Sequence, residues 1–179
     1  MSASKDDWLL KICSAGSYRV GKTSLIRRYA ENKFSSSYTP TIGVDVTTKR
    51  VNVNNQQIKL LLVDTAGQEY FGNLRKAYFT GAFGCMIVYD ITNHATFDDL
   101  DQWIADFRSV VGEEAILAIV GNKLDLGDVR EVTSQEGRNY ANQYGASFYE
   151  VSAKIGGKVI PGIYKDLVRQ YLHSFEEEI

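Results

Sequence analysis

Residues 16–23 read GSYRVGKT, which is a glycine, four further residues and then Gly-Lys-Thr, and they directly follow an apolar stretch at residues 8–13. Glycines let a backbone curl until its N–H groups point inward at a phosphate. Lys22 can then bridge β- and γ-phosphate oxygens, Thr23 can ligate Mg²⁺, and a helix expected over residues 22–32 presents its positive N-terminal end. An ordinary glycine turn before a helix is the alternative. The pattern favours a strand, a phosphate-binding loop and a helix.

Apolar runs and helical patterns alternate along the rest of the chain. The alternation predicts an α/β fold, a doubly wound and mostly parallel sheet with helices on both faces. Four residues, NNQQ at 54–57, separate the second and third strands, which is too short for a crossover, so this edge pair should be an antiparallel hairpin. Apolar stripes at residues 97–111 and 160–172 predict core-facing helices. Strands are expected at residues 9–14, 44–53, 58–64, 85–90, 116–122 and 147–151.

Length and charge narrow the class of protein. The 179 residues are enough for one core, and we expect a single domain over residues 1–179. Twenty Lys and Arg oppose 22 Asp and Glu, a net charge of −2 that does not indicate a nucleic-acid partner. The basic pairs Arg27-Arg28 and Lys49-Arg50 are interpreted as solvated.

The cysteines and the chain ends bear on the compartment. Cys13 and Cys85 lie in apolar runs, as buried thiols of a reducing compartment do. No run approaches ~18 apolar residues, and the last residues, HSFEEEI, contain no cysteine for prenylation. We therefore expect a cytoplasmic monomer without an intrinsic membrane anchor, with peripheral membrane association only through a lipidated tail beyond this sequence.

Two further motifs follow predicted strands. DTAGQE at 64–69 places the Asp64 carboxylate where it can hold Mg²⁺ through water, the Gly67 N–H where it can meet a γ-phosphate, and Gln68 where it can orient an attacking water. NKLD at 122–125 places Asp125 where it can accept from the N1–H and 2-amino groups of guanine. Adenine would leave that carboxylate unpaired, so Asp125 selects guanine.

A third base-side segment, SAK at 152–154, follows the last predicted strand and can supply the Ala153 N–H to the guanine carbonyl. Each short motif occurs by chance in unrelated chains. In this order, with each motif after its own strand, together they indicate one nucleotide site at the carboxyl ends of the strands.

With these motifs the chain resembles the small GTPases of the Ras superfamily over residues 8–175, and within them the Rab branch. GSYRVGKT, TIG at 41–43, DTAGQE, NKLD and SAK stand in that family's order. The resemblance implies that Phe34 flanks the guanine, that Tyr38 closes over the phosphates and that Thr41 ligates Mg²⁺ when a γ-phosphate is present.

The complete expected site is as follows. Lys22 and Gln68 would serve catalysis, with Arg19 as a speculative third residue. The metal ligands would be Thr23, Thr41 and Asp64. GTP and GDP would be bound by Ser17, Tyr18, Arg19, Val20, Gly21, Lys22, Thr23, Ser24, Phe34, Tyr38, Thr41, Gly67, Asn122, Lys123, Asp125, Ser152, Ala153 and Lys154.

The chain departs from the resemblance in two places. Val46 and Val63 replace aromatic residues of the family's effector surface, which would here comprise Val44, Asp45, Val46, Val63 and Tyr78. In the phosphate loop, Tyr18 and Arg19 stand where the family commonly has small residues. Their bulk could obstruct Gln68 or an activator's arginine, Arg19 could itself reach the γ-phosphate, or Arg19 could be solvated.

The resemblance implies a switch that binds GTP with Mg²⁺, hydrolyses GTP slowly and exposes an effector surface, with a role in membrane trafficking. Loops at residues 34–43 and 67–76 should be ordered by the γ-phosphate. Effectors, an exchange factor and a GTPase-activating protein are the expected partners. A GTP-locked interaction scaffold is the alternative, and Asp125 disfavours an ATP-dependent phosphotransferase.

Overall fold

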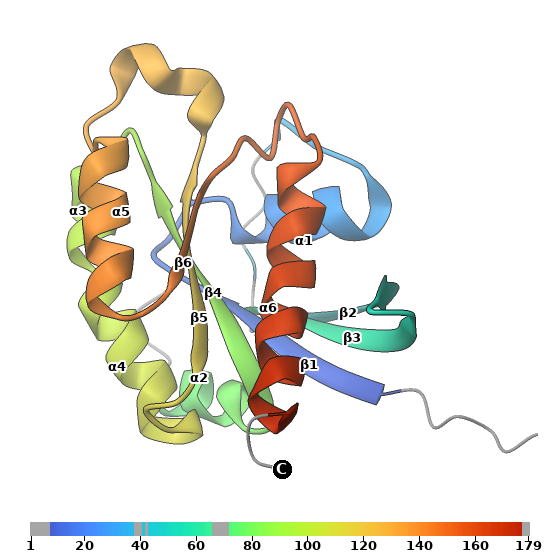
Figure 1. The fold of residues 1–179 in the computed structure, drawn as a ribbon. Helices are drawn as coiled ribbons and strands as arrows, with labels where there is room; N and C mark the ends of the chain where they lie inside the picture. Colours follow the sequence, from blue (N-terminus) through green and yellow to red (C-terminus); the bar gives the residue numbers. More distant parts are fainter. Residues whose placement is uncertain (1–7, 38–40, 42, 66–71, 177–179) are drawn as a thin grey trace, which may run out of the picture.

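A six-stranded sheet forms the centre of the computed structural model, which describes residues 8–37, 41, 43–65 and 72–176 (Figure 1). The strand order is β2-β3-β1-β4-β5-β6, and every neighbouring pair is parallel except β2 with β3. The predicted α/β fold with one antiparallel edge strand is therefore confirmed. The strands are β1 (Trp8–Ala15), β2 (Val44–Val53), β3 (Gln56–Thr65), β4 (Ala82–Asp90), β5 (Ile116–Asn122) and β6 (Ser147–Glu150).

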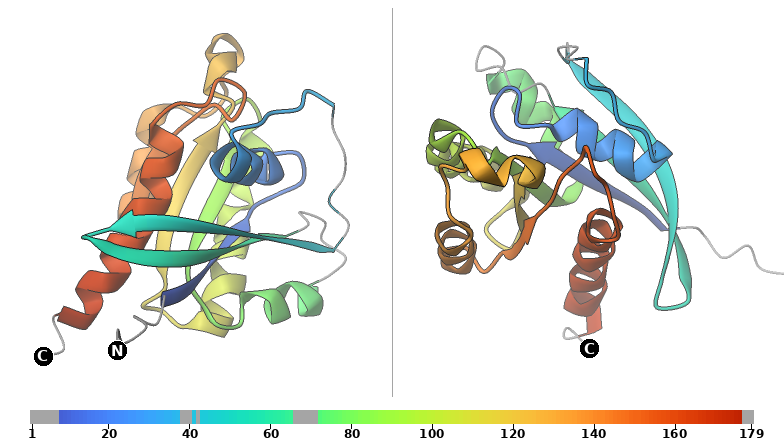
Figure 2. Two further views of the ribbon diagram at one scale, coloured as in Figure 1. Left: turned by 90° about the vertical axis from the view of Figure 1, so that its right-hand side faces the viewer. Right: turned by 90° about the horizontal axis from the view of Figure 1, so that it is seen from above.

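Helices cover both faces of the sheet (Figures 1 and 2). One face carries α1 (Lys22–Glu31) and α6 (Val159–Glu176). The other face carries α2 (Gly72–Phe79), α3 (His94–Asp98), α4 (Leu100–Val111) and α5 (Ser134–Gln143). A short 3₁₀ helix, η2 (Leu124–Val129), follows β5. Within the described parts of the chain, no helix is long and apolar enough to cross a membrane.

Alternating side chains of the central strands build two separate cores. In β1, Ile12 joins the core under α1 and α6, whereas Cys13 joins the core under α2, α4 and α5. In β4, Met86 and Cys85 divide in the same way. This is the side-chain period of two expected of a strand that is covered on both faces. Both cysteines are free and fully buried, as predicted.

Three details differ from the expected elements. The hairpin closes in two residues rather than four, because Asn54 and Asn55 both adopt positive φ, which matches the twist of the flanking strands. The helical stripe at 97–111 belongs to two consecutive helices that meet at Asp99. The segment 67–76, expected as a loop, is helical from Gly72 onward, and residues 67–71 lie outside the described residues.

Val63 corrects the expected effector surface, because only 3% of this residue is exposed. It lies opposite Val46 of the edge strand and opposite Cys13 of β1 in the same row of the sheet. Val46 is 49% exposed because it sits at the edge, whereas Val63, one strand further in, belongs to the core that includes Phe79 of α2. Val63 therefore stabilises the core and presents little surface to a partner.

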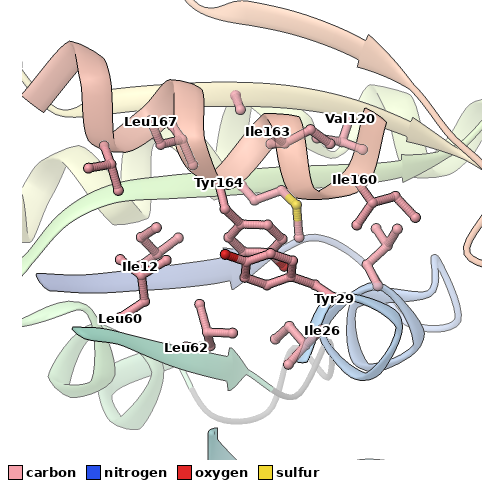
Figure 3. Close-up of a cluster of buried hydrophobic side chains, with 14 of the residues drawn as sticks. Ile12, Ile26, Tyr29, Leu60, Leu62, Val120, Ile160, Ile163, Tyr164 and Leu167 are labelled. Carbon is pink, nitrogen blue, oxygen red and sulfur yellow. The ribbon is translucent and has the colours of Figure 1, made fainter. Parts of the chain in front are cut away.

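Two tyrosines stack at the centre of the α1 and α6 core (Figure 3). The rings of Tyr29 and Tyr164 lie 3.9 Å apart between centroids and are nearly parallel, at 8°. Among the described residues, neither hydroxyl has a hydrogen-bond partner, although both side chains are buried. Burial of a hydroxyl without a partner opposes folding.

We predict that Tyr164→Phe leaves the free energy of unfolding unchanged or raises it by up to ~1 kcal/mol, because the ring stack is kept and a desolvated hydroxyl is removed. Urea denaturation measures the change. Tyr140→Phe is the matched control, since the Tyr140 hydroxyl donates to Asp101 at 2.7 Å and its removal should cost about 0.5–1.5 kcal/mol. A loss of more than ~1 kcal/mol in Tyr164→Phe would show that its hydroxyl is satisfied.

Candidate nucleotide-binding site

The loop between β1 and α1 depends on glycine at both ends. Gly16 has φ 140° and Gly21 has φ 99°, backbone conformations that L side chains rarely adopt. Close contacts exclude a side chain as well: a Cβ on Gly16 would lie 2.2 Å from the Val88 carbonyl oxygen, and one on Gly21 would lie 2.2 Å from Asn122 Nδ2. The loop therefore packs tightly against the ends of β4 and β5.

Lys22 lies beneath this loop as the first residue of α1. Its Nζ donates to the Gly16 carbonyl at 2.7 Å and to the Ser17 carbonyl at 2.9 Å. Burial lowers the pKa of Lys22 to about 8, and the nearby negative charge of Asp64 opposes that shift. A buried ammonium at the start of a helix is suited to bind an anion, because both the charge and the helix dipole attract it.

Three oxygen-bearing side chains converge beside Lys22. The Thr23 hydroxyl donates to Asp64 Oδ2 and lies 2.8 Å from the Thr41 hydroxyl, which in turn lies 3.4 Å from Asp64 Oδ2. Burial raises the pKa of Asp64, against the lowering effects of the Thr23 hydrogen bond and of the Lys22 charge. Asp64 Oδ1 is buried and has no hydrogen-bond partner among the described residues. Two hydroxyls and a carboxylate fit Mg²⁺, which prefers oxygen ligands.

The base-side motifs meet at the ends of β5 and β6. Ser152 Oγ donates to Asp125 Oδ1 at 2.5 Å, which holds that carboxylate in place. Lys123, at φ 68°, forms an ion pair with Asp90 at 2.5 Å. The Ala153 N–H, expected to face a guanine carbonyl, donates to Asn122 Oδ1 at 3.1 Å. A base carbonyl would therefore share this donor with Asn122 or use a neighbouring N–H of the same loop.

A cavity of about 610 Å³ joins the phosphate side to the base side. This volume falls within the range of small-molecule sites. The predicted residues that line it are Tyr18, Arg19, Gly21, Lys22, Thr23, Ser24, Phe34, Thr41, Asn122, Lys123, Asp125, Ala153 and Lys154. The lining does not include Ser17, Val20, Asp64 or Ser152, although each bonds to or adjoins a residue that does line it.

Three predicted residues, Tyr38, Gly67 and Gln68, lie outside the described residues. The cavity also includes residues that the motifs did not indicate: Arg27, Lys33, Ser35, Ser36, Ser37, Thr65 and Leu126. A helical spacing of four from Thr23 could have revealed Arg27, because residues four apart share a helix face. Adjacency to Phe34 could have revealed Lys33 and the serines.

In each basic pair interpreted as solvated, one residue is exposed, Arg27 or Arg50, and the other, Arg28 or Lys49, has specific contacts. Arg28 donates to the carbonyls of Ala153 and Lys154. Lys49 donates to the Tyr29 carbonyl at 2.7 Å, and its ammonium lies 4.9 Å from the centre of the Tyr29 ring. Both cations donate to backbone carbonyls, Arg28 to two in the base loop and Lys49 to one in the last turn of α1, where carbonyls have no partner within the helix.

Comparison with known proteins agrees with this geometry. The sequence profile of the Ras family matches residues 11–173. The chain belongs to the Ras family. It is 39% identical to the Ras-related protein Rab-8B of Homo sapiens over 153 residues, which is 86% of this chain and 74% of the relative. It is 37% identical to Rab-10 of Caenorhabditis elegans over 158 residues, 88% of this chain and 79% of the relative. Rab-8A of Bos taurus is 39% identical over 158 residues, 88% and 76% respectively.

This Ras family member is therefore a Rab-like small GTPase, and its phosphate loop carries two bulky residues. Arg19 has φ 62°, a left-handed conformation that costs a non-glycine residue about 1 kcal/mol. Its guanidinium lies 5.4 Å from the centre of the Tyr18 ring, and Tyr18 is 41% exposed. Both side chains line the cavity, so both can contact a ligand bound there.

We predict that Arg19→Gly raises the free energy of unfolding by about 1 kcal/mol, because glycine adopts the left-handed conformation without the Cβ clash. Thermal or urea denaturation in the absence of nucleotide measures this. Arg19→Ala is the matched control: it removes the guanidinium but keeps the Cβ, so it should not be stabilising. Equal stabilisation by both variants would assign the strain to the long side chain rather than to the backbone.

Proposed function

We propose that this Rab-like GTPase is a switch that binds GTP and GDP with Mg²⁺ and hydrolyses GTP slowly. One observation carries the proposal: Lys22 and Thr23, on the phosphate side, line the same cavity as Asp125 and Ala153, on the base side. A nucleoside di- or triphosphate has a base and a phosphate chain at opposite ends. The cavity offers complementary groups to each.

On the phosphate side, the loop N–H groups and the Lys22 ammonium would bind the phosphates. Thr23, Thr41 and Asp64 would hold Mg²⁺, either directly or through water, and the bound ion would neutralise charge on the β- and γ-phosphates. Gln68 remains the predicted residue that orients the attacking water. The chemistry would rest on positioning and charge, because hydrolysis of this kind needs no protein nucleophile.

On the base side, Asp125 would accept the N1–H and 2-amino donors of guanine. The Ser152 hydroxyl already occupies Asp125 Oδ1, so the carboxylate is oriented before any nucleotide arrives. Phe34, exposed at the cavity rim, would flank the ring. A purine without those donors would leave a desolvated carboxylate unpaired, which disfavours adenine.

The output of the switch would be a surface read by effector proteins. We propose that residues 34–43 and 67–76 become ordered when the γ-phosphate is present and are released on hydrolysis. Of the expected effector-facing residues, Val46 and Asp45 are exposed and Val44 and Tyr78 are half-buried. Because the relatives named above are Rab proteins, we place this function in membrane trafficking, with an exchange factor and an activating protein as further partners.

Nucleotide competition tests the specificity. GDP and GTP should displace a fluorescent GDP analogue from the purified protein at concentrations at least ~10³-fold lower than ATP, because the base-side groups match only guanine. Asp125→Asn should shift the preference toward xanthosine diphosphate, since an amide can donate to the 2-oxo group. Equal competition by ATP and GTP would exclude the switch and would favour a phosphotransferase.

Tyr18 and Arg19 determine whether hydrolysis occurs at a useful rate. We propose that Arg19 reaches the γ-phosphate and supplies in cis the charge that an activating protein supplies in other GTPases. The competing function is a GTP-locked scaffold, favoured by the position of Tyr18, whose ring lines the cavity and could exclude Gln68 or an activator's arginine.

Single-turnover GTP hydrolysis at saturating Mg²⁺ separates these functions. If Arg19 acts in cis, Arg19→Ala should slow hydrolysis roughly tenfold or more, and Gln68→Leu should slow it as well. Tyr18→Gly is the companion variant that opens the loop. An Arg19→Ala rate equal to that of the parent would reduce Arg19 to a surface residue, and acceleration by Tyr18→Gly alone would support the locked scaffold.

A further inference from the structure

Arg28 connects three segments on the base side of the cavity without lining the cavity itself. Its Nε donates to the Ala153 carbonyl at 2.8 Å, and Nη2 donates to the Lys154 carbonyl at 2.7 Å. Nη1 lies 3.2 Å from the carbonyl oxygen of Asn32, where α1 ends. The guanidinium also lies 5.9 Å from the centre of the Phe34 ring. One side chain thus joins α1, the base loop and the segment that enters the cavity.

The base loop is shaped to receive this arginine. A Cβ on Gly156 would lie 3.2 Å from Arg28 Cδ, and Gly156 has φ 81°, so the loop approaches the Arg28 stem at a glycine. The hydrogen bonds to the two carbonyls are charge-assisted and come from a planar group with fixed donor directions. The pair of carbonyls is therefore held in orientation as well as in position.

Orientation of these carbonyls also orients the N–H groups of the loop. A trans peptide unit is planar, so its N–H points opposite to its C=O. The chain has no cis peptide among the described residues. With the Ala153 carbonyl turned toward Arg28, the Lys154 N–H must point away from Arg28. Ala153 and Lys154 both line the cavity. The Ala153 N–H, expected to face the 6-oxo group of guanine, donates to Asn122 Oδ1, so the Lys154 N–H is the neighbouring donor for that group.

We propose that Arg28 is a positioning residue for base recognition: it holds the peptide between Ala153 and Lys154 so that the Lys154 N–H meets the 6-oxo group of the base. The inference rests on the proposed nucleotide site. It assigns base discrimination to a residue of the phosphate-loop helix that does not touch the nucleotide. A lysine at this position would supply charge without the two fixed donor directions.

The test compares GDP with an analogue whose base lacks the 6-oxo group and therefore also the N1–H that Asp125 would accept. The loss of the N1–H is common to the parent and the variant, so the effect of the variant on each nucleotide isolates the 6-oxo contact. Affinities of GDP and of 2-aminopurine riboside 5′-diphosphate, which lacks the 6-oxo group, are measured for the parent and for Arg28→Ala. GDP affinity should fall about tenfold, whereas affinity for the analogue should change less than about twofold. Arg28→Lys should also weaken GDP binding more than binding of the analogue, but by a smaller factor than Arg28→Ala. This variant replaces Arg28→Ala in the test if the alanine variant does not fold. Arg169→Ala, on the exposed surface of α6, is the matched control and should change neither affinity.

Equal weakening of both nucleotides in Arg28→Ala would overturn the inference, because a general loosening of the fold does not distinguish a 6-oxo group. Unchanged GDP affinity in both Arg28 variants would overturn it too. A parent protein that binds GDP no better than ATP would instead overturn the proposed function, and that result is seen before any Arg28 variant is compared.

Discussion

The side chain of Asn122 holds the two halves of the site together. It is buried, its Nδ2 donates to the Val20 carbonyl of the phosphate loop at 2.9 Å, and its Oδ1 accepts from the Ala153 N–H of the base loop at 3.1 Å. The phosphate loop approaches so closely that only glycine fits at position 21. Because each polar atom of the amide is satisfied by a different loop, its loss would leave buried partners unpaired in both.

Sheet topology brings those loops within reach of one amide. The phosphate loop follows β1, Asp64 lies at the end of β3, and NKLD begins at the end of β5, so all three lie at the carboxyl edge of parallel strands. The chain leaves β1 toward α1 on one face and leaves β4 toward α3 on the other face (Figure 1). A cavity at such a divergence of connections is the usual ligand site of a doubly wound sheet.

Arg28 and Asn122 act on the same loop from opposite directions. Asn122 Oδ1 accepts from the Ala153 N–H, and Arg28 Nε donates to the Ala153 carbonyl oxygen. Both groups of one residue are thus bonded to side chains from other elements, which leaves little freedom for the adjacent peptide planes. A loop that is already held rigid loses little conformational entropy when a base binds. This preorganisation favours discrimination between similar bases.

Sequence patterns predicted those structural features that depend on residues close together in the chain. Glycines at 16 and 21 and the burial of β1 on both faces express a local backbone or period requirement, and both were predicted from the sequence, whereas the turn at Asn54 and Asn55 was expected to include four residues. A shared role of Thr23, Thr41 and Asp64 as metal ligands was also expected, for Thr23 and Asp64 from their motifs and for Thr41 from the resemblance alone, and the structure brings the three side chains together.

The sequence by itself therefore determined the strand and helix alternation, the phosphate loop and the order of the base-side motifs, because those depend on neighbouring residues. Only the tertiary structure decided the environments of Arg28, Lys49 and Val63. Arg28 bonds to a carbonyl 125 residues away, Lys49 to one 20 residues away, and Val63 is buried because its strand is second in the sheet. Charge and hydrophobicity are properties of a residue, whereas its partners and its burial depend on which distant segments the fold places beside it.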